Sequence, residues 1–434
     1  MSFLEKQFKL TERHTDVKTE IWAGITTFMT MAYIIFVNPD IVSKTGMPFD
    51  AVMAATCISA AVSCFMMAFM ANYPIALASG MGLNAFFTFS VVLNPAMGTT
   101  WQMALAAVFI EGIIFIILTL TRLRETIVNT IPRSLKLGIA SGIGLFIAFV
   151  GLQSAGIVVA NSATLVTVGN LKEAAPLLAL AGFVLMGVFQ CLGVTGGILL
   201  GILAVTGAGF ALGMVQMPES FVSAPPSLAP IFLQFDFSKV WDIGFWVVVF
   251  TFFFVDFFDT VGTLVGLCAR SGLLDEKGHI AQAKGALMAD AVGTVVGAMC
   301  GTTTVTSYIE SASGIAQGGR TGLTAIVTGI LFLAALFFAP VAKIIPGYAT
   351  APALIIVGVY MMMGLRDIDY DDWTELIPSV LAIFVMPLTY SIAQGIEFGI
   401  VSYVALKVLS GRHKDVSYVM IGLSIIFILK EYLL

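Results

Sequence analysis

A succession of long apolar runs, separated by links that carry most of the charged residues, constrains this chain more than any other feature of its sequence. The chain has 434 residues, of which 59% are hydrophobic and only 11% are charged. A helix that crosses the hydrocarbon core of a bilayer needs about 20 mainly apolar residues. The separable runs are 22–37, 52–71, 74–92, 103–120, 135–152, 176–192, 196–212, 245–267, 285–299, 302–315, 323–341, 351–365, 377–389 and 396–409. We therefore predict an all-α polytopic membrane protein, surrounded by lipid, with about fourteen membrane segments.

Both ends of the chain differ from these runs. Residues 1–20 mix basic and acidic side chains and contain no apolar core, which is typical of a cytoplasmic leader and not of a cleaved signal peptide. The run 416–429 is short and ends in Lys430 and Glu431. We expect it to form a peripheral helix at the membrane surface.

The basic residues predict the orientation of the chain. With fourteen crossings, sixteen of the 21 Lys and Arg residues fall on the side of the N-terminus, and only Lys44, Lys172, Lys239 and Lys343 fall on the other side. Cytoplasmic loops carry an excess of Lys and Arg. We therefore expect a multi-pass protein of the cell (inner) membrane with a cytoplasmic N-terminus.

Charge and cysteine content argue against several other functions. The net charge of −5 is spread thinly and forms no run of one sign, so we predict no nucleic-acid partner. The five cysteines lie in or beside apolar runs without a CxxC spacing. This pattern is typical of buried, unreactive thiols, and we expect no metal site and no cofactor.

Weak internal similarity divides the chain into two halves. Residues 107–118 (AVFIEGIIFIIL) align with 325–336 (AIVTGILFLAAL) and share a Gly-Ile-x-Phe pattern at Gly112 and Gly329 when offset by one residue. A Gly-Ile-x-x-Gly-Ile pattern at Gly197 recurs at Gly395. Because each half holds seven segments, an odd number, the second half enters the membrane from the opposite side. We predict a 7+7 inverted repeat.

The third segment of each half is short and interrupted by glycine. Residues 73–89 read YPIALASGMGLNAFFTF, and 301–319 read GTTTVTSYIESASGIAQGG. Paired broken segments point to a site near the membrane midplane, since irregular backbone is tolerated only where it lines protein or water. We predict that 74–79 and 302–307 are extended and that each leads into a half-helix whose N-terminus faces the centre.

Asp256 and Asp259 lie inside the apolar eighth segment. A carboxylate near the midplane costs about 3 kcal/mol on insertion scales, so it is retained mainly where it handles a substrate or a proton. Residues three apart share a helix face, and two neighbouring carboxylates in a low dielectric do not both ionise cheaply. We predict that the pair takes part in proton coupling. The alternative is a hydrogen-bonded polar pair that joins helices.

Glu310 lies at the start of the second predicted half-helix, where the helix dipole favours an anion. Its carboxylate could accept two parallel hydrogen bonds from a planar ligand, or it could be an ordinary helix-start acid. We expect Gly82 and Asn84 to face it from the first half, with Phe86 as part of an aromatic wall, although such rings more often serve packing. For Glu111, Asp290 and Glu397, the other intramembrane acids, we expect structural or supporting roles.

Three strings together carry a family resemblance. GMGLNAFF (80–87), FVDFFDTVGTL (254–264) and TTTVTSYIESASGI (302–315), in this order, resemble the azaguanine-type branch of the nucleobase-cation symporters, which are permeases for adenine, guanine and hypoxanthine. The resemblance covers nearly the whole chain. It implies that Asp259, Glu310, Asn84 and Gly82 match substrate-binding motif positions and that Asp256 is their acidic neighbour.

The resemblance also implies a division into a core domain and a gate domain, with homodimers formed through the gate in many members. The predicted parts are a leader (1–20), core segments 1–4 (21–121), gate segments 5–7 (122–240), core segments 8–11 (241–343), gate segments 12–14 (344–411) and a peripheral C-terminal helix (412–434). The tenth segment lacks the signature of the related uracil, xanthine and urate carriers, which favours 6-oxo- or 6-aminopurines.

We therefore expect a proton-coupled secondary active transporter that imports hypoxanthine, guanine or adenine by an elevator-like movement of core against gate. Na⁺ is the alternative coupling ion, and Asp256, Asp259 and Glu310 are the candidate proton carriers. A uracil or xanthine symporter of the same fold is the nearest alternative. An anion carrier fits less well, because acids in the site would repel its substrate. An intramembrane aspartyl protease is disfavoured because Asp256 and Asp259 share one helix, and we expect no enzyme activity.

Overall fold

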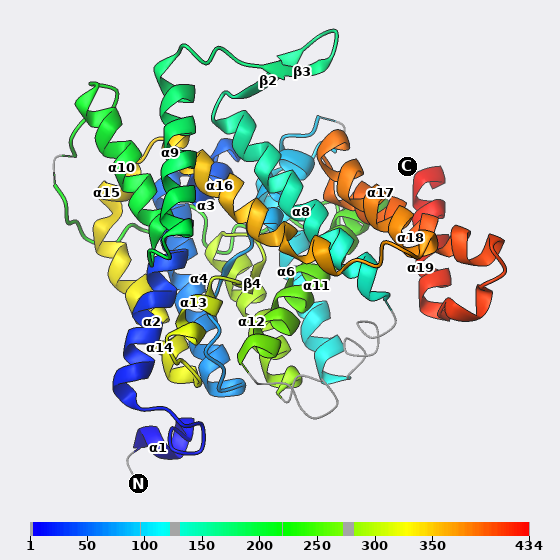
Figure 1. Cartoon of the computed structure of the whole chain (residues 1–434), viewed down its shortest axis with the longest axis horizontal. Helices are drawn as coiled ribbons and strands as arrows, with labels where there is room; N and C mark the ends of the chain where they lie inside the picture. The colour runs from blue at the N-terminus through cyan, green and yellow to red at the C-terminus, as the bar shows by residue number, and fades with distance from the viewer. Residues whose placement is uncertain (1–2, 96, 122–130, 219, 272–281, 434) are drawn as a thin grey trace.

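The structure, a computed structural model, describes residues 3–95, 97–121, 131–218, 220–271 and 282–433. Its helices are α1 (Phe3–Phe8), α2 (Val17–Met31), α3 (Ile34–Val42), α4 (Phe49–Met70), α5 (Met81–Ala85), the π-helix η2 (Phe86–Val92), α6 (Trp101–Leu120), α8 (Arg133–Ser154), α9 (Ala174–Cys191), α10 (Gly197–Ala211), α11 (Ile243–Ser271), α12 (Ala283–Cys300), α13 (Ser311–Ala316), α14 (Gly322–Ala335), α15 (Ala339–Lys343), α16 (Gly347–Met362), α17 (Trp373–Thr389), α18 (Ile392–Leu409) and α19 (Tyr418–Leu433). Figure 1 shows their arrangement.

The prediction of a mostly helical membrane protein is confirmed. Within the described ranges, 10 helices are long and apolar enough to cross a membrane. Four shorter apolar helices are Met81–Val92, Gly197–Ala211, Trp373–Thr389 and Tyr418–Leu429. The count of fourteen segments therefore stays a prediction. Arg122, Arg124 and Lys277, which contribute to the predicted charge asymmetry, lie outside the described residues.

Two small antiparallel sheets interrupt the helices. Strand β1 (Leu77–Ser79) pairs with β4 (Val305–Ser307), with Ala78 opposite Thr306. Strands β2 (Val158–Asn161) and β3 (Leu165–Val168) form a hairpin that the expectation of an all-α chain did not include. The Asn161 side chain accepts hydrogen bonds from the backbone NH groups of Ala163 (2.8 Å) and Thr164 (3.1 Å), which stabilises the turn. The hairpin projects from the end of the molecule opposite the N-terminus (Figure 1).

The long helices pack as two groups. In the first, α4 lies between α12 and α14, and α2 and α6 pack on α14 and α12 respectively. In the second, α8 contacts α16 and α17, α17 contacts α18, and α9 contacts α10 and α16. Many of the buried residues of α4 are Ala and Ser, and small residues let membrane helices approach closely.

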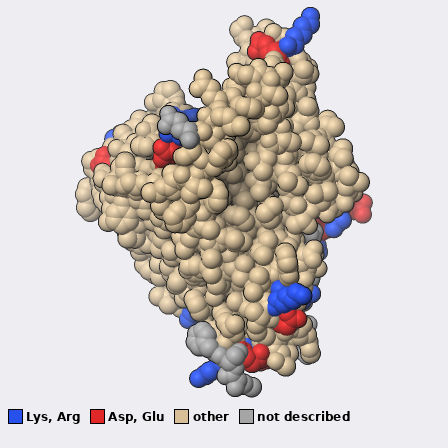
Figure 2. All heavy atoms as spheres, turned by 90° about the vertical axis from the view of Figure 1, so that its left-hand side faces the viewer, with Lys and Arg blue, Asp and Glu red and all other residues tan. Residues whose placement is uncertain are grey.

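The outer surface is suited to lipid. Large apolar side chains such as Ile117, Leu177, Val184 and Leu388 are exposed on the helix faces. Figure 2 shows that the central part of one face carries no Lys, Arg, Asp or Glu, and that these residues lie toward its ends and edges. Such a belt is expected where hydrocarbon contacts the protein.

The chain ends are tied to this body. Phe8 and Leu10 are buried, and the Asn72 amide donates a hydrogen bond to the Phe8 carbonyl at 2.9 Å. Helix α2 starts at Val17, so it takes in the last part of the expected leader. At the other end, the ring of Phe427 on α19 packs against Phe250 and Phe254 of α11.

Candidate functional site

The two broken segments meet through β1 and β4, and their backbones are joined beyond the strands. The Gly80 NH donates to the Thr304 carbonyl at 2.9 Å, and the Tyr308 NH donates to the Ala76 carbonyl at 3.0 Å. The Tyr308 hydroxyl donates to the Ser79 carbonyl at 2.5 Å. These bonds pair backbone groups that regular helices would have paired internally. Helix α5 follows β1 and α13 follows β4, as the sequence predicts.

Glu310 is the residue that precedes α13, and its side chain is 7% exposed. The hydroxyl of buried Tyr33 donates a hydrogen bond to the Glu310 carboxylate. Tyr33 lies in the two-residue break between α2 and α3, so this break aims a donor at the site. The sequence analysis missed Tyr33. Its only signal is a tyrosine within the first apolar run.

Asp259 lies near Glu310 but comes from a different helix, α11. Its side chain is partly exposed, whereas that of Asp256, one turn earlier, is buried. The Thr306 side chain of β4 lies beside the Asp259 carboxyl, and Asp290 and Glu310 are its acidic neighbours. Tyr308 lies close to both Asp259 and Glu310. The structure thus brings the two predicted acids together beside β4.

Asp256 belongs to a second polar cluster between α11 and α12. The Thr260 hydroxyl lies 3.1 Å from Asp256 Oδ1 and 2.9 Å from Asp290 Oδ1, and it can donate to either carboxylate. On the far side of β4, the Thr304 hydroxyl donates to Glu111 Oε2 at 3.3 Å. Asp290 and Glu111 therefore lie closer to the broken segments than the sequence indicates.

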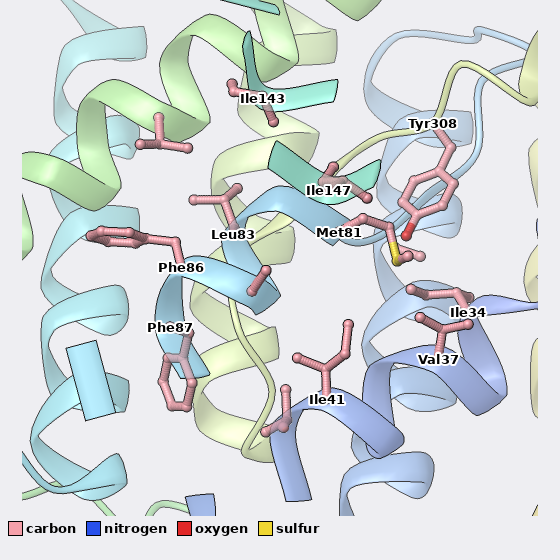
Figure 3. Close-up of a cluster of buried hydrophobic side chains, with 14 of the residues drawn as sticks. Ile34, Val37, Ile41, Met81, Leu83, Phe86, Phe87, Ile143, Ile147 and Tyr308 are labelled. Carbon is pink, nitrogen blue, oxygen red and sulfur yellow. The ribbon is translucent and has the colours of Figure 1, made fainter. Parts of the chain in front are cut away.

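The predicted site residues of the first broken segment, Gly82, Asn84 and Phe86, have three different neighbours. The Thr303 hydroxyl donates to the Asn84 side-chain oxygen, and the buried Asn84 Nδ2 has no hydrogen-bond partner among the described residues. A Cβ added to Gly82 would lie 2.7 Å from Ile143 Cγ2, so α5 packs directly on α8. The Phe86 ring packs edge-to-face on Phe252 at a centroid distance of 5.0 Å. Figure 3 shows Ile143 and Ile147 beside α5, and Tyr308 close to Met81.

A third polar cluster, also missed from the sequence, supports the strand junction. Asn38 Nδ2 lies 2.9 Å from Thr302 Oγ1 and 2.7 Å from Thr56 Oγ1, and the Thr302 and Ser79 hydroxyls are 2.6 Å apart. All four side chains are buried. Asn38 links α3 and α4 to the segment that precedes β4.

The region beside β4 therefore offers two carboxylates and several hydroxyls. The first broken segment adds the buried amide of Asn84, which contacts Thr303 and not, as the sequence analysis expects, Glu310. Such a set can hydrogen-bond a flat heterocycle that carries both NH groups and acceptor atoms. Among the described residues, no group of three or more His, Cys, Asp or Glu side chains is arranged to hold a metal ion.

Comparisons with known proteins match this chain to membrane permeases. The Permease family matches residues 18–398. The guanine/hypoxanthine permease PbuG of Bacillus subtilis (strain 168) is 46% identical over 97% of this chain and 98% of its own length. The adenine permease AdeP of Escherichia coli (strain K12) is 44% identical over 98% of this chain and 95% of its own length.

A solved structure extends the likeness to the fold. The transmembrane domain of the bicarbonate transporter BicA from a cyanobacterium superimposes with a TM-score of 0.67. The match covers 88% of this chain and 97% of that domain at 16% sequence identity. At this identity the comparison describes the fold alone.

Proposed function

This chain belongs to the Permease family, and from that premise we propose that it carries purine nucleobases across the membrane by secondary active transport. Permeases are transporters and not enzymes. The relatives named for adenine and for guanine/hypoxanthine align with nearly the whole chain, which favours a purine as the substrate. They do not rank hypoxanthine, guanine and adenine against one another.

The proximity of Asp259 and Glu310 is the observation that carries this proposal. Ionised carboxylates accept hydrogen bonds, and a purine presents NH groups along one planar edge. Asn84 Nδ2, which is buried without a hydrogen-bond partner in the described part of the chain, supplies the opposite polarity for a ring nitrogen or carbonyl oxygen. Phe86 and Gly82 complete the proposed site as apolar residues of the first broken segment.

Proton coupling is the second part of the proposal. We infer that a proton binds within the group formed by Asp256, Asp259 and Glu310, because burying several negative charges together is costly. Thr260 joins Asp256 to Asp290, so the proton site extends to α12. Import of a neutral base with one proton would gain about 2.3 kcal/mol per 100 mV of membrane potential.

Equivalent contacts in the two halves support the proposed 7+7 inverted repeat. A Cβ at Gly112 of α6 would lie 2.8 Å from Val295 of α12, and one at Gly329 of α14 would lie 2.8 Å from Phe65 of α4. In the repeat, α6 corresponds to α14 and α12 to α4, so these two contacts are the same contact made twice. The pairing of β1 with β4 follows the same symmetry.

The packing of the long helices as two groups supports the proposed division into a core and a gate domain. We propose that the core, with both broken segments, slides against the gate and carries the bound base past it. The packing of α5 on α8 through Gly82 lies between the two groups, since β1 and α5 belong to the core and α8 to the gate. A homodimer through the gate remains part of this proposal.

An anion carrier is the rival that the fold alone would allow, because BicA transports bicarbonate. Two acids in the site speak against it, since a second negative charge would be repelled. A uracil or xanthine symporter is the nearer rival. Competition for labelled hypoxanthine by excess uracil, xanthine and bicarbonate separates these possibilities.

The site assignment is tested by uptake of radiolabelled hypoxanthine into proteoliposomes that contain the purified chain. We expect Asp259→Asn and Glu310→Gln each to lower uptake at least about tenfold, as loss of one charged hydrogen bond costs about 1.5–3 kcal/mol. Asp50→Asn is the matched control, because Asp50 is an exposed acid that pairs with Lys343 at 3.0 Å. Uptake unchanged in both site variants would remove the assignment.

A further inference from the structure

Glu20 is a buried carboxylate at the start of α2, outside the three polar clusters described above. It is 0% exposed. Its oxygens accept hydrogen bonds from the backbone NH groups of Arg320 (2.8 Å), Thr321 (3.3 Å) and Thr324 (3.2 Å) and from the Thr324 hydroxyl (2.6 Å). These donors lie at the start of α14 and in the link that follows α13. The carboxylate thus holds the link between α13 and α14 against α2.

The same link is fastened to the end of α13. The Arg320 guanidinium donates to the carbonyls of Ile315 (2.7 Å) and Gly319 (2.8 Å). Ile315 belongs to the last turn of α13, whose first turn follows Glu310. A displacement of the Arg320 backbone would therefore be passed to this six-residue helix.

Helix α2 also contacts α13 along its length. A Cβ on Gly314 would lie 2.1 Å from Thr27 Oγ1 and 2.6 Å from the Ala23 carbonyl oxygen, so the two backbones are in close contact. The Thr30 hydroxyl lies 3.4 Å from the Glu310 carbonyl oxygen, and Tyr33, just beyond α2, donates to the Glu310 side chain. Glu20 and Tyr33 thus hold opposite ends of one segment against α2 and its extension.

We propose that Glu20 is a positioning residue of the transport site, which fixes α13 along α2 and so sets where the Glu310 carboxylate meets the substrate. The inference rests on the proposed function, since it assumes that Glu310 binds the purine. The carboxylate offers one oxygen to the Arg320 NH and the other to Thr321 and Thr324. An amide has one acceptor oxygen, so its NH₂ would face at least one of these NH groups and that contact would be lost. Glu20 itself does not contact the substrate.

The test compares concentration dependence of hypoxanthine uptake in proteoliposomes for the wild type, Glu20→Gln and Asp16→Asn. Asp16 is a matched control at the same end of α2, where it caps the helix by accepting from the Thr19 NH at 2.9 Å. We expect Glu20→Gln to raise KM about tenfold with Vmax changed less than twofold, and Asp16→Asn to leave KM unchanged. In a Glu310→Asp background, where the carboxylate is already displaced, Glu20→Gln should add less than twofold.

A milder variant guards against misfolding of Glu20→Gln. Thr324→Val removes one donor to Glu20 while keeping the side-chain volume, and we expect KM to rise two- to threefold. If the wild type takes up none of hypoxanthine, guanine and adenine, the proposed function fails and this inference fails with it. If the wild type transports and KM is unchanged in both Glu20→Gln and Thr324→Val, or rises equally in Asp16→Asn, the positioning role alone is overturned.

Discussion

At the scale of single residues, the acids around the broken segments have neutral hydroxyl groups as neighbours. The Tyr33 hydroxyl donates to Glu310, and the Thr260 hydroxyl lies between the carboxylates of Asp256 and Asp290. Thr306 lies beside Asp259. A hydroxyl can donate to a carboxylate without cancelling its charge, so the acid keeps its ability to bind a proton or an NH group. Among the described residues, these acids thus have hydroxyl groups beside them and no paired lysine or arginine.

Tyr33→Phe tests this role directly. The substitution removes one hydroxyl and keeps the ring, so Glu310 loses a donor in a buried place. Because a hydrogen bond to a charged group contributes about 1.5–3 kcal/mol, we expect the KM for hypoxanthine to rise at least about tenfold. Tyr403→Phe, which removes a buried tyrosine hydroxyl on α18, is the control. Equal KM values for both variants would contradict the role of Tyr33.

At the scale of helices, a group of charged residues, here called the latch, joins the start of α17 and the end of α18 to the segment that follows α18. Asp372 caps α17 and accepts from the Thr374 hydroxyl (2.6 Å), Arg412 (2.7 Å) and the almost fully buried Lys407 (3.3 Å). Glu375 also pairs with Lys407 at 3.3 Å. The Thr374 hydroxyl, together with Arg412 and Lys407, holds the pKa of the Asp372 carboxyl well below its usual range.

The latch predicts a pH-dependent stability. The pKa of the Asp372 carboxyl is lower in the folded chain than its value of about 3.9 in an unfolded one. The ionised carboxylate therefore contributes its full stabilisation of the fold above about pH 4, and this contribution is lost as the pH falls through the pKa of the folded chain. Asp372→Asn should lower the unfolding midpoint by about 3 °C at pH 7, since it removes the partly exposed pair with Arg412 and leaves the buried Lys407 with one acidic partner fewer. Thermal unfolding in detergent at pH 7, 5 and 3 should show this difference shrinking only below about pH 4. Asp371→Asn, at a neighbouring exposed position, should show no such difference.

At the scale of the whole molecule, the surface between the two helix groups is where the proposed movement of core against gate takes place. One hydrogen bond crosses it at the end of η2, from the Ser90 hydroxyl to the Tyr390 carbonyl at 2.8 Å. The Tyr390 ring also packs against Phe89 of η2 and Phe146 of α8. The predicted orientation puts this contact on the outer side of the membrane, so it would close the site from outside.

Ser90→Ala should therefore favour conformers open to the outside. In a Cys191→Ala background with a cysteine introduced at Ile147, we expect an impermeant maleimide added from outside to react roughly fivefold faster, as one hydrogen bond contributes about 1 kcal/mol. Ser402→Ala is the control, because the Ser402 hydroxyl bonds only to carbonyls of its own helix, those of Phe398 (2.5 Å) and Gly399 (3.1 Å). Slower or unchanged labelling would contradict a closing role for Ser90 or the predicted orientation.

The sequence alone determined the membrane class, the positions of most helices and the strand-then-helix form of the two broken segments. Apolar runs and glycine breaks are local signals, and the bilayer leaves few ways to satisfy them. The sequence also indicated Asp259 and Glu310 as candidate site residues, because an acid in an apolar run is costly enough to stand out. The β2–β3 hairpin escaped, since its eight strand residues lie in the link between the predicted segments 135–152 and 176–192, where no membrane constrains the backbone.

Only the tertiary structure decided which residues surround the acids. Tyr33 and Asn38 are unremarkable in sequence, and each contacts a residue more than 200 positions away, Glu310 and Thr302 respectively. The tertiary structure also showed that Glu20, in the first turn of α2, accepts hydrogen bonds from the link beyond α13 and from the start of α14. Hydrogen bonds of this kind depend on how helices dock, and docking depends on close contacts at small residues such as Gly314. A pattern read along the chain does not contain that information, because it records spacing and not contact.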